Sequence, residues 1–307
     1  MTVANRVAYG ETLVELAKEN PNIVVLDADV SKSTGTVLFK KAFPDRFITV
    51  GIAEQNMMGM AAGLASCGKM PFAATFGVFT SMRAVEHVRN AICYTKLNVK
   101  IAGTHSGIET GPDGATHQAI EDIAIIRSIP NIKLLVPATP NASRKLTTAA
   151  AQTDGPVYLR FGKEPAQEFY PDDEEFPIGG SKQLRDGSAA AIIACGGMLA
   201  VALTAADELA KRGTRVRVID MYSIKPIDED AIVRAATETR GIVTIEDHSV
   251  IGGLGGAVSE VTATRRPARV LRVGLRDVFG HSGDLEGLRA LYGLTAEKLI
   301  EAVGRLE

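Results

Sequence analysis

The sequence predicts an α/β protein made of two units, each a parallel or mixed sheet covered by helices. Short runs rich in valine and isoleucine alternate with amphipathic segments along the chain, which is the pattern of a parallel sheet with helices on both faces. One Pro- and Gly-containing stretch interrupts this alternation near the middle. At 307 residues and 46% hydrophobic content, the chain can fill more than one core, so we expect two domains.

The apolar runs divide into two series of predicted strands. The first series is NIVVLDAD (22–29), FITVG (47–51), NVKIAG (98–103), IKLLVPA (132–138) and PVYLRF (156–161). The second series is AAAIIAC (189–195), TRVRVID (214–220), GIVTIED (241–247) and ARVLRVG (268–274). Because each run is short, buried in character and β-branched, each reads better as a strand than as a helix.

The domain boundary is predicted between the two series. The segment EPAQEFYPDDEEFPIGGS (164–181) has three prolines, two glycines and a cluster of acids, which break both the helical and the strand period. The sequence therefore predicts a first domain over 1–165, a linker over 166–182 and a second domain over 183–307.

One uncharged stretch, 187–206, is long enough to span a bilayer. Its first part is a short apolar run that ends at Gly196 and Gly197, and its second part becomes amphipathic and ends at Gly213. A buried strand, a tight turn and a helix explain this stretch better than a membrane span, so we expect no membrane contact.

Charge and cysteine content argue against a nucleic-acid-binding, an exported or a disulfide-rich protein. The 34 basic and 36 acidic residues are nearly balanced and no basic block stands out, so nothing predicts a nucleic-acid surface. The first residues carry charges within a helical period, unlike a signal peptide. The three cysteines show neither disulfide nor metal-ligand spacing, which favours a reducing, cytoplasmic location: Cys67, Cys93 and Cys195.

Polar residues follow two of the predicted strands. Glu54 stands where FITVG hands over to a helix, and the glycine-rich loop after NVKIAG contains His105, Asp113 and His117. An acid at a helix start can merely complement the helix dipole, and the loop residues can serve turns and caps. A metal site is the rival chemical interpretation, but none of the compact zinc spacings is present, so we predict no metal ligands in this chain.

The order of two motifs then identifies a family. The segments GIAEQNM (51–57), DGATHQ (113–118) and GPVYLRFGKEP (155–165) resemble the pyrimidine-binding domain of transketolases and 1-deoxyxylulose-5-phosphate synthases. The segments MYSIKPID (221–228) and IEDHSVIGGLGGAV (245–258) resemble their C-terminal domain. The resemblance covers essentially the whole chain and implies thiamine diphosphate as cofactor.

The resemblance also implies roles for particular residues. It places Glu54 against N1′ of the cofactor's aminopyrimidine ring, a role for which the carboxyl group needs a proton and hence burial. Phe76 and Phe79 match the positions that stack on this ring, with Phe79 the better match. Matching residues contact the cofactor or the sugar: Asp29 near the cofactor, His105 and His117 near the donor carbonyl, and Asp113 on a hydroxyl.

Phosphate recognition is implied for four scattered positions: Arg6, Ser33, Arg160 and Lys163. Many relatives carry arginine where this chain has Lys163. Because a lysine binds phosphate as a point charge rather than as a bidentate fork, the sugar phosphate substrates can differ from the usual ones. Solvation of a charged surface is the alternative interpretation of all four residues.

The motif that holds the diphosphate in this family, Gly-Asp-Gly followed by Asn, does not occur here. The resemblance therefore implies a partner, an N-terminal transketolase subunit that holds the diphosphate and Mg²⁺, in a homodimer or heterotetramer. The predicted reaction is transfer of a two-carbon ketol unit between sugar phosphates. The alternatives are a subunit like 1-deoxyxylulose-5-phosphate synthase, which is usually a single fused chain, a 2-oxo-acid dehydrogenase beta-like subunit, and a non-catalytic dimeric paralogue.

Overall fold

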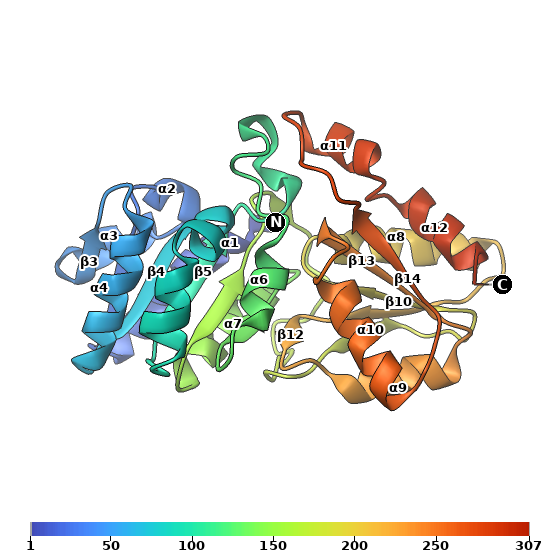
Figure 1. The fold of residues 1–307 in the computed structure, drawn as a ribbon, viewed down its shortest axis with the longest axis horizontal. Coiled ribbons are helices and arrows are strands. Elements are labelled where there is room, and N and C mark those ends of the chain that lie inside the picture. The colour runs from blue at the N-terminus through green and yellow to red at the C-terminus, as the bar shows by residue number, and fades with distance from the viewer. Residues whose placement is uncertain (1, 307) are drawn as a thin grey trace.

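The computed structural model describes residues 2–306 and contains two α/β units side by side (Figure 1). The first unit is built on a seven-stranded sheet whose strands are all parallel except β12. In sheet order the strands are β12 (Ser223–Lys225), β6 (Lys133–Leu135), β7 (Val157–Arg160), β5 (Lys100–Thr104), β4 (Met70–Phe76), β2 (Ile23–Asp27) and β3 (Phe47–Thr49). The predicted parallel α/β sheet is confirmed.

Helices cover both faces of this sheet because its central strands are apolar on both sides. One face carries α1 (Asn5–Glu19), α3 (Val37–Ala42) and α7 (Pro140–Gln152), and the other carries α4 (Glu54–Ser66), η3 (Val88–Cys93) and α6 (Asp122–Ser128). The remaining short helical segments are α2 (Ser31–Thr34), η1 (Pro44–Arg46), η2 (Phe79–Arg83), α5 (Val85–His87) and η4 (Ile108–Asp113).

The second unit repeats the plan with five strands in the order β14 (Val270–Leu275), β13 (Ile242–Ser249), β10 (Ala191–Ala194), β11 (Arg217–Asp220) and β9 (Lys182–Arg185). Only β9 runs antiparallel. Its sheet is covered on one face by α8 (Met198–Lys211) and α12 (Ala296–Gly304), and on the other by α9 (Glu229–Glu238) and α10 (Leu254–Arg265). Helix α11 (Leu285–Tyr292) lies beside η4 of the first unit (Figure 1).

The two units share strands and cores. The segment Ser223–Lys225, which follows the second unit's β11, crosses back and pairs with β6 as the edge of the first sheet. A further two-stranded pair joins β1 (Val3–Ala4) to β8 (Pro165–Ala166). Each of the two large hydrophobic clusters contains residues of both units. Each apolar run predicted as a strand contains an observed strand. Five observed strands were not predicted: β1, β4, β8, β9 and β12.

The segment between the units is packed rather than loose. Phe176 is buried edge-on between Tyr170 and Tyr222, with ring centroids 4.9 and 5.1 Å apart. The Tyr170 hydroxyl donates to Asp220 Oδ2 over 2.8 Å. The predicted linker over 166–182 is thus anchored on the second unit, and its use as a domain boundary stays a prediction.

The uncharged stretch has the predicted structure of strand, turn and helix. It forms β10, then turns at Gly196, whose φ of +57° suits glycine, and then enters α8. Within residues 2–306, no helix is long and apolar enough to cross a membrane.

Candidate active site at the carboxyl edge of the first sheet

The residues singled out from the sequence converge because of strand direction. Asp29 follows β2, Glu54 follows β3, Phe76 ends β4, His105 follows β5 and Lys163 follows β7. These strands are parallel, so their carboxyl ends meet at one edge of the sheet. The candidate site therefore lies at this edge, where loops and helix starts come together.

Glu54 is the buried acid of the site. It is the first residue of α4 and is 2% exposed, as its predicted role requires. Its Oε2 accepts from Arg83 Nη1 over 3.0 Å, and the Arg83 guanidinium lies 4.3 Å from the centroid of the Phe79 ring. The sequence interpretation did not single out Arg83. A signal was available, because Arg83 stands four positions after Phe79 in a helical segment.

The rings of Phe76 and Phe79 lie between Arg83, the partner of Glu54, and the two histidines. The Phe76 and Phe79 rings are stacked with centroids 6.0 Å apart, and Phe76 stacks on His105 at 4.1 Å. His117 meets Phe79 edge-on at 5.4 Å. Phe76 is buried and Phe79 is half-buried. The structure thus brings four predicted site residues into one continuous wall next to Glu54.

Both histidines belong to the segment 104–118, called the histidine loop below. His105 is buried, with a left-handed φ of +56°, and its Nδ1 is 3.1 Å from Thr104 Oγ1. Burial, followed by the nearby charges of Arg6 and Lys163, lowers the pKa of His105 to about 3. Its imidazole is therefore neutral at neutral pH. His117 is half-buried, and Asp113, at the end of η4, is exposed.

Two basic residues, Arg6 and Lys163, lie near His105. Arg6 donates from Nη1 to the Ser33 carbonyl over 2.9 Å and from Nε to the Lys163 carbonyl over 3.1 Å. These three predicted phosphate contacts are thus neighbours. Buried Asp27 holds the α2 segment that carries Ser33, because its carboxylate accepts from Val30 N and from the Thr34 and Thr36 hydroxyls.

Asp29 lies close to this group but makes no described side-chain contact. It is exposed and has a left-handed φ of +68°, and the next residue, Val30, packs against the cluster that contains Phe76. The structure therefore places Asp29 at the rim of the aromatic wall.

Arg160 is located differently from the expectation. Its side chain is 7% exposed and donates from Nε to Asp122 Oδ2 over 2.8 Å. Its Nη2 donates to the carbonyls of Ala119 and Asp247. A guanidinium engaged in the interior by three partners cannot reach a substrate phosphate without breaking them. We therefore withdraw Arg160 from the substrate-binding set and assign it to the packing between the two units.

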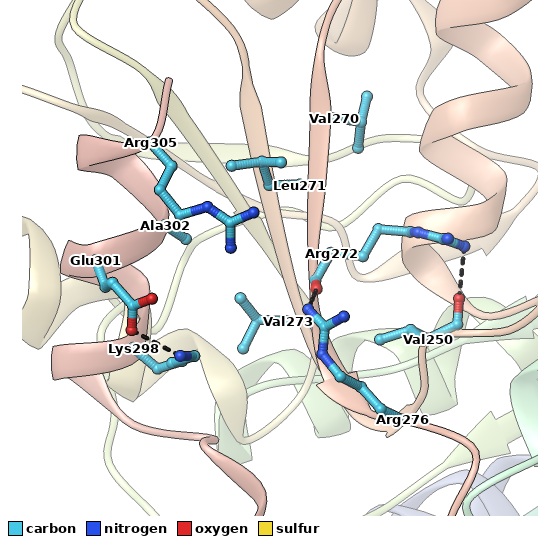
Figure 2. Close-up of a pocket in the computed structure, with 10 residues that line it drawn as sticks. All are labelled: Val250, Val270, Leu271, Arg272, Val273, Arg276, Lys298, Glu301, Ala302 and Arg305. Atoms are coloured by element: carbon cyan, nitrogen blue, oxygen red, sulfur yellow. Dashed lines mark hydrogen bonds and ion pairs between the residues drawn. The ribbon is translucent and has the colours of Figure 1, made fainter. Parts of the chain in front are cut away.

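Two other features carry no site chemistry. No group of three or more His, Cys, Asp or Glu side chains suited to a metal ion occurs in the described part of the chain. A pocket of about 220 Å³ between β14 and α12 contains four basic residues, all exposed: Arg272, Arg276, Lys298 and Arg305. Figure 2 shows Lys298 turned toward Glu301 and Arg272 toward the Val250 carbonyl. Without a buried polar group, this pocket is a solvated charged surface.

The chain is similar to known proteins in both of its units. Residues 1–167 match the model of the transketolase pyrimidine binding domain, and residues 179–299 match that of the transketolase C-terminal domain. The chain is 47% identical over 301 residues to a transketolase C-terminal section of Methanocaldococcus jannaschii, covering 97% of this chain and 94% of that protein. It is 40% identical to a 6-deoxy-6-sulfo-D-fructose transketolase subunit of a Clostridium species, covering 97% and 92%.

A solved structure described as a split gene transketolase, inactive beta4 tetramer, is 51% identical and superposes with a TM-score of 0.93, covering 99% of this chain and 98% of that one. The two family models together cover most of the chain, and the two relatives and this structure each match nearly its full length. The chain therefore belongs to the transketolase family, as a C-terminal subunit of a ketol-transferring enzyme of the split-gene kind.

Proposed function

We propose that this chain forms the half of an active site that binds the pyrimidine ring of thiamine diphosphate, and that a second subunit holds the diphosphate with Mg²⁺. Together they would transfer a two-carbon ketol unit between sugar phosphates. The observation that carries the proposal is the continuous arrangement of buried Glu54, the aromatic pair and the two histidines at one edge of the sheet.

The residues of the aromatic wall fit the ring of the cofactor. The Glu54 carboxyl group is 2% exposed and is joined to the Phe79 ring through Arg83, so it offers a hydrogen-bonding group to a ring nitrogen in a site that excludes water. Phe79, half-buried at the rim, offers the face on which an aromatic ring can stack. When bound, thiamine diphosphate supplies the nucleophilic carbon that takes up the ketol unit.

The opposite side of the site fits a sugar phosphate. His105 is neutral, so it can donate one hydrogen bond and accept another at the sugar's oxygens. His117 and Asp113 stand farther along the same loop, where hydroxyl groups of the sugar would lie. Lys163 has a partly exposed ammonium group and, with Arg6 and Ser33, offers positive charge and hydroxyl donors to the phosphate.

A partner subunit is part of the proposal. Mg²⁺ prefers several oxygen ligands, and the Gly-Asp-Gly motif that the family resemblance assigns to this task does not occur in the sequence. The related structure's description as an inactive tetramer of beta chains supports the need for a second kind of chain. We propose that two copies of this chain combine with two partner subunits. The free thiols at Cys67, Cys93 and Cys195 support a reducing, cytoplasmic location.

The test is titration calorimetry of thiamine diphosphate with Mg²⁺ into the chain alone and into the chain mixed with its partner. We expect tight binding only in the mixture, together with ketol transfer from xylulose 5-phosphate. Glu54→Gln should bind the cofactor but lower turnover by about 100-fold or more. Tight binding to the chain alone would refute the divided site. Formation of 1-deoxyxylulose 5-phosphate from pyruvate and glyceraldehyde 3-phosphate would instead identify the synthase alternative.

A further inference from the structure

The second unit contributes none of the residues of the proposed site, yet it contacts the histidine loop through hydrogen bonds at two places. One contact comes from the end of β13 and the other from the turn 280–283 that precedes α11. Figure 1 shows this part of the second unit beside the green loop of the first. The two contacts touch the loop next to His105 and next to His117.

The first contact is made by Asp247. Its Oδ1 and Oδ2 both accept from the Ile108 main-chain N–H, over 3.0 and 3.1 Å, and the side chain is buried. Gly107 allows this approach, because a Cβ at that position would lie 2.1 Å from Asp247 Oδ2. A carboxylate of the second unit thus fixes the main chain three residues after His105.

The charged groups facing Asp247 come from three elements. Glu109 lies on η4, Arg160 on β7 and Arg289 on α11. Burial, reinforced by Glu109, raises the pKa of Asp247 to about 7, while Arg160, the hydrogen bond from Ile108 N–H and Arg289 oppose the rise. Arg289 also pairs with Glu109 over 3.3 Å. The carboxyl group therefore changes its charge near neutral pH.

The second contact is made by the turn 280–283. Gln118, which follows His117 directly, donates from Nε2 to the His281 carbonyl over 3.0 Å. The fit is tight, since a Cβ on Gly280 would lie 1.6 Å from Gln118 Oε1 and a Cβ on Gly114 would lie 2.5 Å from Ser282 Oγ. Both ends of the histidine loop are therefore held by main-chain and side-chain groups of the second unit.

We propose that Asp247 and the turn 280–283 form a clamp through which the C-terminal domain positions His105 and His117 for the sugar substrate. Asp247 and Gln118 are positioning residues in this proposal, because they act through the loop. The expected effect on turnover rests on the proposed function. The contacts that make up the clamp do not, and they can be measured in the loop without any assay of activity. The clamp gives a task to a domain that carries no reacting group.

The test uses the two-subunit enzyme with Asp247→Ala and Asp247→Asn. Because a loop displaced by about 1 Å can cost about 100-fold, Asp247→Ala should lower kcat/KM for the donor sugar phosphate by about 10- to 100-fold. The affinity for thiamine diphosphate should fall less than kcat/KM does, since Glu54 and Phe79 lie on α4 and η2 and meet the clamped loop only through the rings of His105 and His117. Asp230→Asn, at an exposed position of α9, is the matched control and should change neither quantity.

The pH profile separates positioning from general packing. Asn offers the Ile108 N–H a neutral acceptor, as protonated Asp247 does, and it does not ionise. Asp247→Asn should therefore keep the activity that the wild type retains below pH 7, higher than Asp247→Ala and lower than the wild type at pH 8. In the wild type, kcat/KM should fall as the pH drops through about 7, where Asp247 becomes protonated and accepts more weakly. This limb should be absent from Asp247→Asn.

Hydrogen exchange of the segment 106–110 gives a readout that does not depend on activity. Asp247→Ala should speed exchange at the Ile108 amide by about tenfold or more. If Asp247→Ala fails to fold, Gln118→Met removes the other contact at similar volume and should give the same selective loss of kcat/KM. Unchanged exchange and unchanged kcat/KM in both variants, or a parallel loss of cofactor affinity, would overturn the clamp. Faster exchange in an assembly that shows no ketol transfer would uphold the clamp and refute the proposed function.

Discussion

Arg160 joins three parts of the interior through one guanidinium. It pairs with Asp122 and donates to carbonyls on the loop before α6 and on β13. Removing it would leave the Asp122 carboxylate buried without a counter-charge. Arg160→Ala should therefore lower the free energy of unfolding by about 3–5 kcal/mol, as measured by denaturant titration.

Lys163→Ala is the control for Arg160→Ala. The Lys163 side chain is partly exposed, and its described ion pair with Glu164 is 3.8 Å long. The unfolding free energy of Lys163→Ala should stay within about 0.5 kcal/mol of the wild type, while the KM for sugar phosphate rises about tenfold. An Arg160→Ala protein of normal stability with a raised KM would restore the phosphate-binding interpretation.

His105 makes stability depend on pH. Its pKa of about 3 in the folded chain lies below the ordinary value of 6.5, because burial disfavours the imidazolium. Between these values the unfolded chain takes up a proton that the folded chain does not, so the stability contributed by neutral His105 is lost as pH falls below 6.5. Between pH 6.5 and 5, the wild type should lose about 1.6 kcal/mol more than His105→Asn.

The asparagine variant is chosen because Asn tolerates the left-handed φ of position 105 better than most residues. Denaturant titrations at both pH values give the comparison. Equal losses in the two proteins would mean that His105 takes up its proton in the folded state as readily as in the unfolded chain.

At the scale of elements, the segment 166–182 behaves as part of the second unit's core. Phe176 is 3% exposed and fills the space between two tyrosines. Phe176→Ala should cost about 3–5 kcal/mol, because it leaves a cavity that the surrounding rings can fill only in part. Limited proteolysis should cut the variant within this segment and leave the wild type intact.

An exposed aromatic provides the comparison for that experiment. Phe279→Ala removes a ring that is 76% exposed, so it should leave both stability and the cleavage pattern close to those of the wild type. Rapid cleavage of the wild type between residues 166 and 182 would show instead that the segment is a loose connection.

The whole molecule is held together by the crossing of the chain between its two sheets. Without β12, strand β6 would become an open edge whose Leu134 and Leu135 lose their cover. A truncated chain of residues 1–182 should therefore aggregate on size-exclusion chromatography under conditions in which the full chain elutes as a defined species. A folded, monomeric 1–182 would show that the first unit is stable without β12.

Many of the strands could be predicted from the sequence because a short apolar run is also a segment that the fold buries in a sheet. The runs around Ile23, Ile101 and Ile192 are short, mostly apolar segments, and each forms a strand that is buried in a sheet. Strand β4 escaped prediction, since MPFAATF has a proline and three small residues and follows a helix after only a short turn. β12 escaped because three residues carry too little pattern, and its pairing is decided by contact with β6.

The sequence alone determined the family and most of the order of strands and helices, and it named the candidate site residues, because a motif such as DGATHQ keeps its meaning wherever it occurs. Only the tertiary structure decided which of these residues meet. Glu54, His105 and Lys163 converge because parallel strands end at one edge, whereas Arg160, on the same sheet, turns inward to Asp122. The contact between Asp247 and Ile108 joins positions far apart in the chain, and a pairing of that kind is settled by packing rather than by local sequence.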